Sequence, residues 1–597
     1  MPALWDNVRL GMATDASLQR AMDDARSGRI DAALASVRML VRRRPDDQDA
    51  IALLGLLLTQ SGQLDQAIHH LTRAVSLAPR LPGPRNNLAN ALVNAGRFAE
   101  AEAQWTAAVA ADPSYARAWF GLVVARTALD DSAGALAAAE RASALKPDWP
   151  ELALNHAHAL AAADRAEDAA SLLRECVKRH PGDPSLASNF LLSLNYLDVP
   201  AEDLAHAHRG FAACVRHAPS PPETDRDPER PLRVGVLTRD LRTHAVGFFA
   251  DPILRHPPAG WSVTVFDTGI SRPEDTMEAG FRRMAAGWVQ VGSLDDAALD
   301  AAIRARRIDV LVDLAAHTSG GRLPALDRKP APVIATAIGY PNTTGHPCVD
   351  VRFVDSVTDP PGSESRCTER LARIDPCFLC YRPPADAPEP SLPEDGSPVT
   401  FGSFNLLSKI SAGTLRAWRE TLDRCAGSRL LLKSKSLADP SARDHLLARA
   451  DAAGIAPGRI EIIAFTTGIM EHLALYRRVH VALDTFPYNG TTTTCEALWM
   501  GVPVVTIEGD RHSGRVGASI LRAAGMRELV ARSVDEYACT AAALAANRPH
   551  LLDLRAGLRG RLSASPLLDG AGWSTRFFGA LRDEWRAWCA RTRPRGG

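Results

Sequence analysis

The sequence has no excess of charge of either sign and no long apolar run. Lys+Arg and Asp+Glu both number 69 in 597 residues, so the chain as a whole has no net attraction for nucleic acid or an anionic membrane. Its longest apolar run, Ile51 to Leu58, is far too short to cross a bilayer. We therefore expect neither a membrane span nor a nucleic-acid partner.

Signals for export, for a metal site and for redox chemistry are also lacking. The first residues carry Asp6 and Arg9 without a following hydrophobic region, so no signal peptide is predicted. The ten cysteines are scattered, and the pair Cys377 and Cys380 has no second pair at zinc-ribbon spacing. No G-x-G-x-x-G motif follows a strand, which leaves redox dinucleotide chemistry unsupported. These absences predict a cytoplasmic protein with reduced thiols and no bound metal.

A repeat of 34 residues organises the N-terminal third of the chain. Prolines, alanines and a Gly or Asp turn position all keep this spacing: Pro45, Pro79, Pro113, Pro147 and Pro181; Ala33, Ala67, Ala101, Ala135 and Ala169; Gly28, Gly62, Gly96, Asp130 and Asp164. Small alanines let two helices pack closely, the turn joins them, and proline stops the second helix. This layout is that of the tetratricopeptide repeat (TPR). It predicts an α-solenoid over residues 14–218 whose groove takes a protein partner, with a ligand-free spacer as the alternative.

Two proline-rich stretches, residues 219–231 and 386–397, divide the remainder into a first half (232–385) and a second half (398–597) with a C-terminal helix. Short β-like runs alternate with helical stretches in both, which predicts two parallel sheets. The runs are 233–238, 263–266, 310–312, 333–336 and 351–354 in the first half, and 400–401, 430–432, 461–463, 479–483 and 504–507 in the second. Ligands of such sheets gather at the carboxyl ends of the strands, so we expect a cleft between the halves.

The segment from residue 483 to residue 499 is the most informative. A strand ends at Asp484, a Pro/Asn/Gly turn follows, and Thr491 to Thr494 opens a helix. Free backbone N–H groups and the helix dipole at this point suit a diphosphate, and the threonine hydroxyls add donors. Glu496, one turn into the helix, can accept hydrogen bonds from a ribose. The alternative is plain N-capping by threonine, although four successive threonines exceed what a cap needs.

This segment, the stretch Gly402 to Ile410 and the repeat array together resemble the O-GlcNAc transferase/SPINDLY family, glycosyltransferase family 41. The resemblance covers about residues 15–588 and is closer to the SPINDLY and bacterial branch. It implies a TPR solenoid followed by a GT-B fold of two Rossmann-like halves. It further implies an inverting transfer of a sugar, without a metal or other cofactor, from a nucleotide-sugar to Ser or Thr of a protein.

The resemblance assigns the donor diphosphate to one lysine and a group of polar neighbours. Lys409 occupies the position of the family's diphosphate-binding lysine, a task that suits its compact charge. Thr492 and Thr493 match the family's phosphate-binding pair, and we group Thr491 and Asn405 with them as donor-binding residues.

Recognition of the nucleoside is implied for two further side chains. Glu496 stands where an acidic residue binds the ribose, and His472 aligns with the histidine that packs on the nucleobase. Two positions depart from the pattern: Leu406 replaces a Gln or Asn, and Ile469 replaces a lysine that helps to hold UDP in animal relatives. Each change removes a hydrogen-bond donor, so the identity of the donor stays open.

The first half contributes the candidates nearest to the acceptor. His244 follows the first predicted strand and matches the family's active-site histidine, which can take a hydroxyl proton or orient the acceptor. His317 follows another strand end and is a second catalytic candidate. Tyr340, Pro341 and Thr343 lie in a segment that matches the family's loop near the sugar and acceptor; the alternative for this loop is a simple turn.

Several functions remain open at this point. UDP-GlcNAc is the expected donor, but GDP-fucose, UDP-glucose or a CMP-activated nonulosonic acid transferred to flagellin would use the same chemistry. The chain could instead be a TPR adaptor with a degenerate transferase half. Transfer to a small molecule or lipid is a third reading, for which the TPR array has no evident use.

Overall fold

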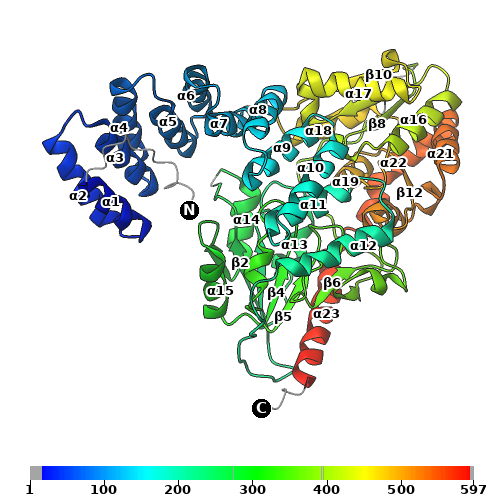
Figure 1. Cartoon of the computed structure of the whole chain (residues 1–597). Helices are drawn as coiled ribbons and strands as arrows, with labels where there is room; N and C mark the ends of the chain where they lie inside the picture. Colours follow the sequence, from blue (N-terminus) through cyan, green and yellow to red (C-terminus); the bar gives the residue numbers. More distant parts are fainter. Residues whose placement is uncertain (1–15, 273, 392, 394–395, 592–597) are drawn as a thin grey trace. The chain divides into compact units, whose positions relative to one another are not determined.

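The computed structural model describes residues 16–591 except 273, 392, 394 and 395. The chain separates into two compact units, Met1–Leu172 with Asp439–Arg443, and Leu173–Ala438 with Asp444–Gly597. Figure 1 colours the chain along its sequence, with the repeat helices in blue and cyan.

The repeat region is a series of paired helices, as the 34-residue spacing predicts. They are α1 (Ala16–Arg26), α2 (Ile30–Arg43), α3 (Gln48–Gln60), α4 (Leu64–Leu77), α5 (Pro82–Asn94), α6 (Phe98–Ala111), α7 (Ala116–Ala128), α8 (Ser132–Leu145), α9 (Pro150–Ala162) and α10 (Ala166–Arg179), the last of which continues into the second unit. All five turn positions have positive φ, from 61° at Asp130 to 80° at Gly28. Glycine adopts this conformation without strain, and Asp is among the few other residues that tolerate it. The five repeat alanines are at most 3 % exposed, which confirms close helix packing.

The first sheet has seven parallel strands in the order β3-β2-β1-β4-β5-β6-β7. They are β1 (Arg233–Thr238), β2 (Ser262–Asp267), β3 (Gly287–Gln290), β4 (Val310–Asp313), β5 (Val333–Thr336), β6 (Val351–Val354) and β7 (Arg370–Arg373), accompanied by α13 (Gly247–Arg255), α14 (Thr276–Met284) and α15 (Asp296–Ala305). Strands β4, β5 and β6 are buried at every position, as expected for a parallel sheet covered on both faces. The five predicted strands are confirmed, whereas both edge strands escaped prediction.

The second sheet has six parallel strands in the order β10-β9-β8-β11-β12-β13. They are β8 (Thr400–Ser403), β9 (Arg429–Lys433), β10 (Ile460–Ile463), β11 (Val481–Leu483), β12 (Val504–Ile507) and β13 (Val530–Ala531); the helices are α16 (Ala412–Arg424), α17 (Pro440–Ala452), α18 (Ile469–Ala474), α19 (Thr492–Trp499), α20 (Val516–Ala523), α21 (Val534–Ala546) and α22 (Arg548–Ser563). Two Rossmann-like sheets of this kind make up the predicted GT-B fold, which follows the TPR helices in sequence.

Segments from both ends of the second unit cover the first sheet. Helices α11 (Pro184–Leu194), α12 (Ala201–Arg209) and η2 (Gly210–Cys214) bring Leu191 and Phe211 into one core with Leu237 of β1. The C-terminal helix α23 (Gly570–Ala590) follows the second sheet in sequence but packs on the first (Figure 1). The Phe577 and Phe353 rings lie 4.7 Å apart. The sequence shows that α23 is amphipathic but not which sheet its apolar face covers. The solenoid predicted to reach residue 218 therefore shares its last helices with the core of the first sheet.

Candidate functional site

Three of the predicted site segments follow strands at the points where the strand order of each sheet reverses. In the first sheet this point lies between β1 and β4, and His244 follows β1. In the second it lies between β8 and β11, and Lys409 and the threonine segment follow these two strands. Ligands of open parallel sheets bind at these points, because the loops on either side diverge there and leave a crevice.

Asp484 organises the turn that precedes the threonines. One carboxylate oxygen accepts hydrogen bonds from the backbone N–H groups of Thr485 (2.8 Å) and Gly490 (2.6 Å), and the other accepts from the Thr506 hydroxyl (2.7 Å). Burial raises the pKa of Asp484 to about 6, against the lowering effect of these hydrogen bonds and of Lys409. Sequence reasoning treated Asp484 only as the end of a strand; an acid directly after a buried strand is the signal that could have revealed its role.

Lys409 is held beneath this turn. Its side chain is almost fully buried, and its Nζ donates to the carbonyl oxygen of Asn489 (2.7 Å) and lies 3.8 Å from the ring centroid of Tyr488. Burial lowers the pKa of Lys409 to about 8, opposed by the nearby Asp484 carboxylate. An ammonium has three N–H donors, and only one of them has a hydrogen bond within the described part of the chain. The other two are available to an anionic ligand.

Helix α19 begins without a side-chain cap. Thr491 occupies the N-cap position, yet its side chain accepts no hydrogen bond from the first turn. The Thr493 hydroxyl donates instead to the side-chain oxygen of Asn405 (2.9 Å), and the Thr494 hydroxyl to the Gly490 carbonyl (3.0 Å). Simple N-capping therefore does not explain the four threonines. The first N–H groups of α19 have no side-chain acceptor among the described residues and form a site suited to an anion.

His472 and Glu496, predicted to contact the base and the ribose, lie side by side. The His472 Nε2 is 3.0 Å from a Glu496 carboxylate oxygen, and both side chains are buried. The His472 Nδ1 is buried without a hydrogen-bond partner among the described residues. Lys433, which ends β9, was not predicted as a site residue; burial lowers its pKa and Glu496 opposes that effect. Its position as the last residue of a buried strand could have identified it.

His244 is the predicted catalytic residue that remains accessible, with 38 % of its side chain exposed. Its Nδ1 accepts a hydrogen bond from the Val246 N–H (3.3 Å) and lies 3.6 Å from an Asp240 carboxylate oxygen. Burial is the main cause that lowers the pKa of His244, and Asp240 acts in the opposite direction. A neutral ring that accepts at Nδ1 carries its proton on Nε2, so it presents an N–H donor.

His317 does not have a free nitrogen. Its Nδ1 is 2.9 Å from the Ser188 hydroxyl of α11, and its Nε2 is 2.7 Å from the Thr344 carbonyl oxygen. Only 2 % of the residue is exposed, and burial lowers its pKa to about 3. The structure thus places this predicted catalytic candidate inside the core, where it ties the loop after β5 to α11.

The loop residues Tyr340, Pro341 and Thr343 are buried as well. Tyr340 uses its hydroxyl for hydrogen bonds with the Asn195 amide (3.1 Å) and with a buried histidine ring nitrogen (2.6 Å). The Thr343 hydroxyl donates to Glu369 at 2.5 Å. These side chains therefore fix the shape of the loop from the inside.

Neither a metal cluster nor a membrane-spanning helix is found among the described residues. No group of three or more His, Cys, Asp or Glu there could hold a metal ion. Within the same ranges, no helix combines the length and apolarity needed to cross a membrane.

Comparison with known proteins accounts for both parts of this chain. The family Glycosyl transferase family 41 matches residues 217–381 and 388–576, and tetratricopeptide repeat families match residues 18–82 and 58–123. The "probable UDP-N-acetylglucosamine–peptide N-acetylglucosaminyltransferase SPINDLY" of Solanum lycopersicum is 36 % identical over 424 residues, 69 % of this chain and 45 % of that protein. Its Arabidopsis thaliana counterpart is 36 % identical over 423 residues, 69 % of this chain and 46 % of its own. The chain thus spans less than half the length of these relatives.

A solved structure extends the match to almost the whole chain. A mutant O-GlcNAc transferase from Thermobaculum terrenum is 30 % identical, with a TM-score of 0.64, and the match covers 97 % of this chain and 99 % of that one. Family, repeats and fold agree with the resemblance inferred from the Thr-rich segment, Lys409 and the 34-residue spacing. The chain belongs to glycosyltransferase family 41.

Proposed function

We propose that this chain transfers a sugar from a nucleotide-sugar to Ser or Thr of a protein acceptor, with inversion and without a metal. The observation that carries the proposal is the convergence of the buried Lys409 ammonium and the uncapped start of α19 on one turn. A protein that belongs to a glycosyltransferase family has a use for such a site, because negative charge develops on the departing phosphate.

On the donor side, Lys409 and the first N–H groups of α19 stabilise the leaving diphosphate. Thr491 and Thr492 have no hydrogen bond from their hydroxyls to other described residues, so they can donate to phosphate oxygens, while Thr493 is held by Asn405. Together these groups supply the positive potential that a metal supplies in other transferases. With the phosphates bound in this crevice, His472 contacts the base of the nucleoside and Glu496 its ribose.

We propose UDP-GlcNAc as the donor, because the SPINDLY relatives are named for it and the solved relative is named an O-GlcNAc transferase. Leu406 is 60 % exposed and offers no polar group at a position where relatives have one. GDP-fucose and CMP-activated nonulosonic acids therefore belong in the same test.

On the acceptor side, the Ser or Thr hydroxyl attacks the anomeric carbon from the face opposite the diphosphate. The new C–O bond forms as the bond to the phosphate oxygen breaks, the diphosphate leaves with the electron pair, and the hydroxyl proton passes to solvent. His244 orients the reacting oxygens through its Nε2–H. The TPR groove selects the protein, for which flagellin is one candidate, and the loop with Tyr340, Pro341 and Thr343 lines the sugar site through its backbone.

The direct test incubates the chain with each donor and a library of Ser/Thr peptides. Intact-mass measurement should show one peptide-linked sugar, and one equivalent of nucleotide released, with at least one donor. Donor binding without any transfer to peptide or protein would instead support a TPR adaptor. Transfer only to water or small molecules would support an enzyme that acts on a small molecule or lipid.

Substituting His244 separates orientation from proton removal. His244→Ala should lower kcat by about 10²-fold and leave donor affinity unchanged. His244→Gln, which keeps an N–H donor but cannot act as a base near neutral pH, should recover at least a tenth of the wild-type kcat. A Gln variant as inactive as the Ala variant would contradict the orienting role and assign His244 as the base.

The low pKa of Lys409 predicts that donor affinity falls in alkaline solution. In the free protein its pKa is about 8, and a bound diphosphate raises it, so binding takes up a proton above pH 8. The diphosphate itself is already fully ionised there. Calorimetric titration with UDP or GDP should show affinity that falls about twofold from pH 7 to pH 8 and then up to tenfold per pH unit. Lys409→Met should bind weakly at every pH; an equal fall in that variant would assign the effect to another group.

A further inference from the structure

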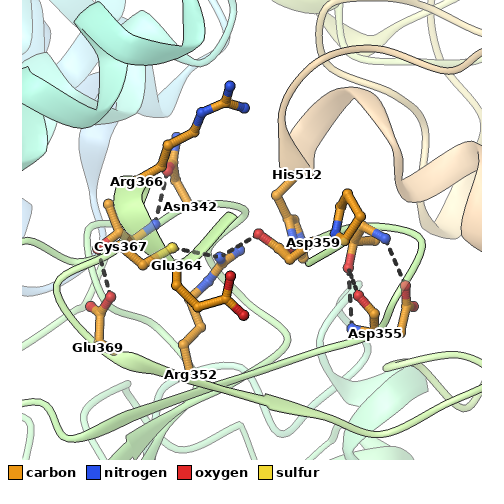
Figure 2. Close-up of polar contacts among 12 residues, drawn as sticks. Asn342, Arg352, Asp355, Asp359, Glu364, Arg366, Cys367, Glu369 and His512 are labelled. Carbon is orange, nitrogen blue, oxygen red and sulfur yellow. Dashed lines mark hydrogen bonds and ion pairs between the residues drawn. The ribbon is translucent and has the colours of Figure 1, made fainter. Parts of the chain in front are cut away.

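We propose that a second, small pocket in this chain binds an oxyanion, a phosphate or carboxylate group. The pocket lies between helix α12, the segment that follows β6 and the turn that follows β12, all in the second unit. Arg352, Asp359 and Arg366 line it from the first half, and Arg511 and His512 from the second. Figure 2 labels four of these residues, Arg352, Asp359, Arg366 and His512. It is too small for a nucleotide and fits a single anionic group. The proposal does not depend on the transferase chemistry.

Two buried guanidinium groups in this pocket have unused donors. Arg352 is 2 % exposed; its Nη1 lies 3.3 Å from an Asp359 carboxylate oxygen, but its Nη2 has no hydrogen-bond partner among the described residues. Arg511 is 8 % exposed, and neither its Nε nor its Nη1 is hydrogen-bonded within the described ranges. An Asp510 carboxylate oxygen lies 3.5 Å from the Nε. Burial lowers the pKa of Arg511. Buried N–H groups without acceptors are costly and rare in folded proteins, so the pocket lacks an acceptor.

Two of the carboxylates nearby, Asp359 and Glu369, already accept hydrogen bonds from other groups, and Asp510 approaches Arg511 only to 3.5 Å. Asp359 is shared between Arg352 and His512, whose Nδ1 is 2.5 Å away (Figure 2). Glu369, also drawn in Figure 2, accepts from Thr343 and from the Thr344 backbone. An oxyanion matches the unused donors, since its oxygens accept from both guanidinium groups at once.

Arg366 closes the rim of the pocket. Its Nε is 2.8 Å from Glu202 of α12, and its Nη1 donates to the Asp510 carbonyl oxygen (2.9 Å). Arg366 thus joins α12 to the turn after β12, at Asp510, the residue that precedes Arg511. The pocket is assembled from both halves, so an anion in it would hold α12 and the two halves together.

The pocket borders the donor site but is separate from it. The turn that carries Arg511 and His512 continues to Ser513, whose carbonyl oxygen accepts from the Asn489 N–H (2.9 Å). The Asn489 carbonyl oxygen in turn accepts from Lys409. Phosphate bound at one place can therefore be distinguished from phosphate bound at the other by single substitutions.

The test is calorimetric titration of the full chain with inorganic phosphate and with D-glucuronate, at constant ionic strength and beside neutral D-glucose. Arg511→Met should weaken anion binding at least tenfold, and Arg511→Lys should recover part of the lost affinity. The control Arg527→Met, which removes an exposed arginine of the second half, should change the affinity less than twofold. Lys409→Met should also leave it within twofold. Because the Arg511 Nε and Nη1 have no hydrogen-bond partner among the described residues, Arg511→Met should unfold at the wild-type temperature or above. If it unfolds at a lower temperature, Arg511→Lys, which keeps the charge, is compared with wild type instead.

The two ligands identify the group that the pocket takes. Binding of phosphate alone assigns a phosphate site, and binding of glucuronate but not glucose assigns a carboxylate site. The proposal is overturned if neither ligand binds, if Arg511→Met binds as wild type does, or if Lys409→Met alone abolishes phosphate binding.

Discussion

Replacement of Lys409 with methionine is expected to lower sugar transfer by about 10²- to 10³-fold without unfolding the protein. Methionine fills similar space but removes the charge that faces the departing diphosphate. The folded protein also loses a buried charge: since the folded pKa of Lys409 is about 8, below the ordinary value of 10.5, charged Lys409 destabilises the fold most at pH below 8. Thermal unfolding at pH 7 should therefore occur within a few degrees of wild type.

The matched control for this variant is Lys146→Met in the repeat region, where the lysine is exposed. It makes the same change in charge and should leave kcat/KM within twofold. Wild-type turnover by Lys409→Met, measured with the donor that proves active, would contradict the assignment of Lys409 to the diphosphate.

Replacement of Gly490 with alanine should be the second most damaging change, at about 10²-fold in kcat/KM. A Cβ at this position would lie 2.5 Å from the Thr493 hydroxyl oxygen and 2.9 Å from the Asn405 side-chain oxygen. These two atoms share the hydrogen bond that fixes the start of α19. The added methyl must push them apart and displace the threonine segment from the phosphate position.

Gly458→Ala is the matched control, because a Cβ there meets no atom of the described residues within 4 Å. Both variants should retain the far-UV and near-UV circular dichroism of the parent. Equal activity of the two alanine variants would show that the Asn405–Thr493 contact has no part in catalysis.

The repeat region was predictable because its signals are local and recur. An alanine, a turn residue and a proline within 34 residues specify each helix pair. The positive φ at Asp130 and Asp164 confirms that Asp takes the place of glycine in the last turns. The central strands were predictable for a similar reason, since strands buried on both faces read as continuous apolar runs.

Three of the four edge strands were missed because that signal fades at the edge of a sheet; β10 was predicted because three of its four residues are isoleucine. β7 (Arg370–Arg373) has two arginines in four residues and is buried at none of them. β13 has only two residues, and β3 is buried at no position. Pairing with a neighbouring strand, which the sequence does not reveal, makes them strands.

The candidate site was predictable in its residue types but not in its partnerships. Asn405 and Thr493 are 88 positions apart and His472 and Glu496 are 24 apart, so only folding shows that they share hydrogen bonds. For His317 the missing information led to a wrong expectation. Its position after a strand suggested that it lines the cleft, but it is buried in contact with Ser188 of α11, which lies 129 residues earlier in the sequence. Arg352, Arg511 and their pocket carried no sequence signal.

Calorimetric titration of the full chain with UDP, GDP and CMP beside uridine, guanosine and cytidine tests most directly whether Lys409 and α19 bind the donor phosphate. At least one nucleotide should bind ten times more tightly than its nucleoside, and that advantage should disappear in Lys409→Met. Equal affinity for every nucleotide and its nucleoside would contradict a phosphate site at Lys409 and, with it, the proposed transferase mechanism.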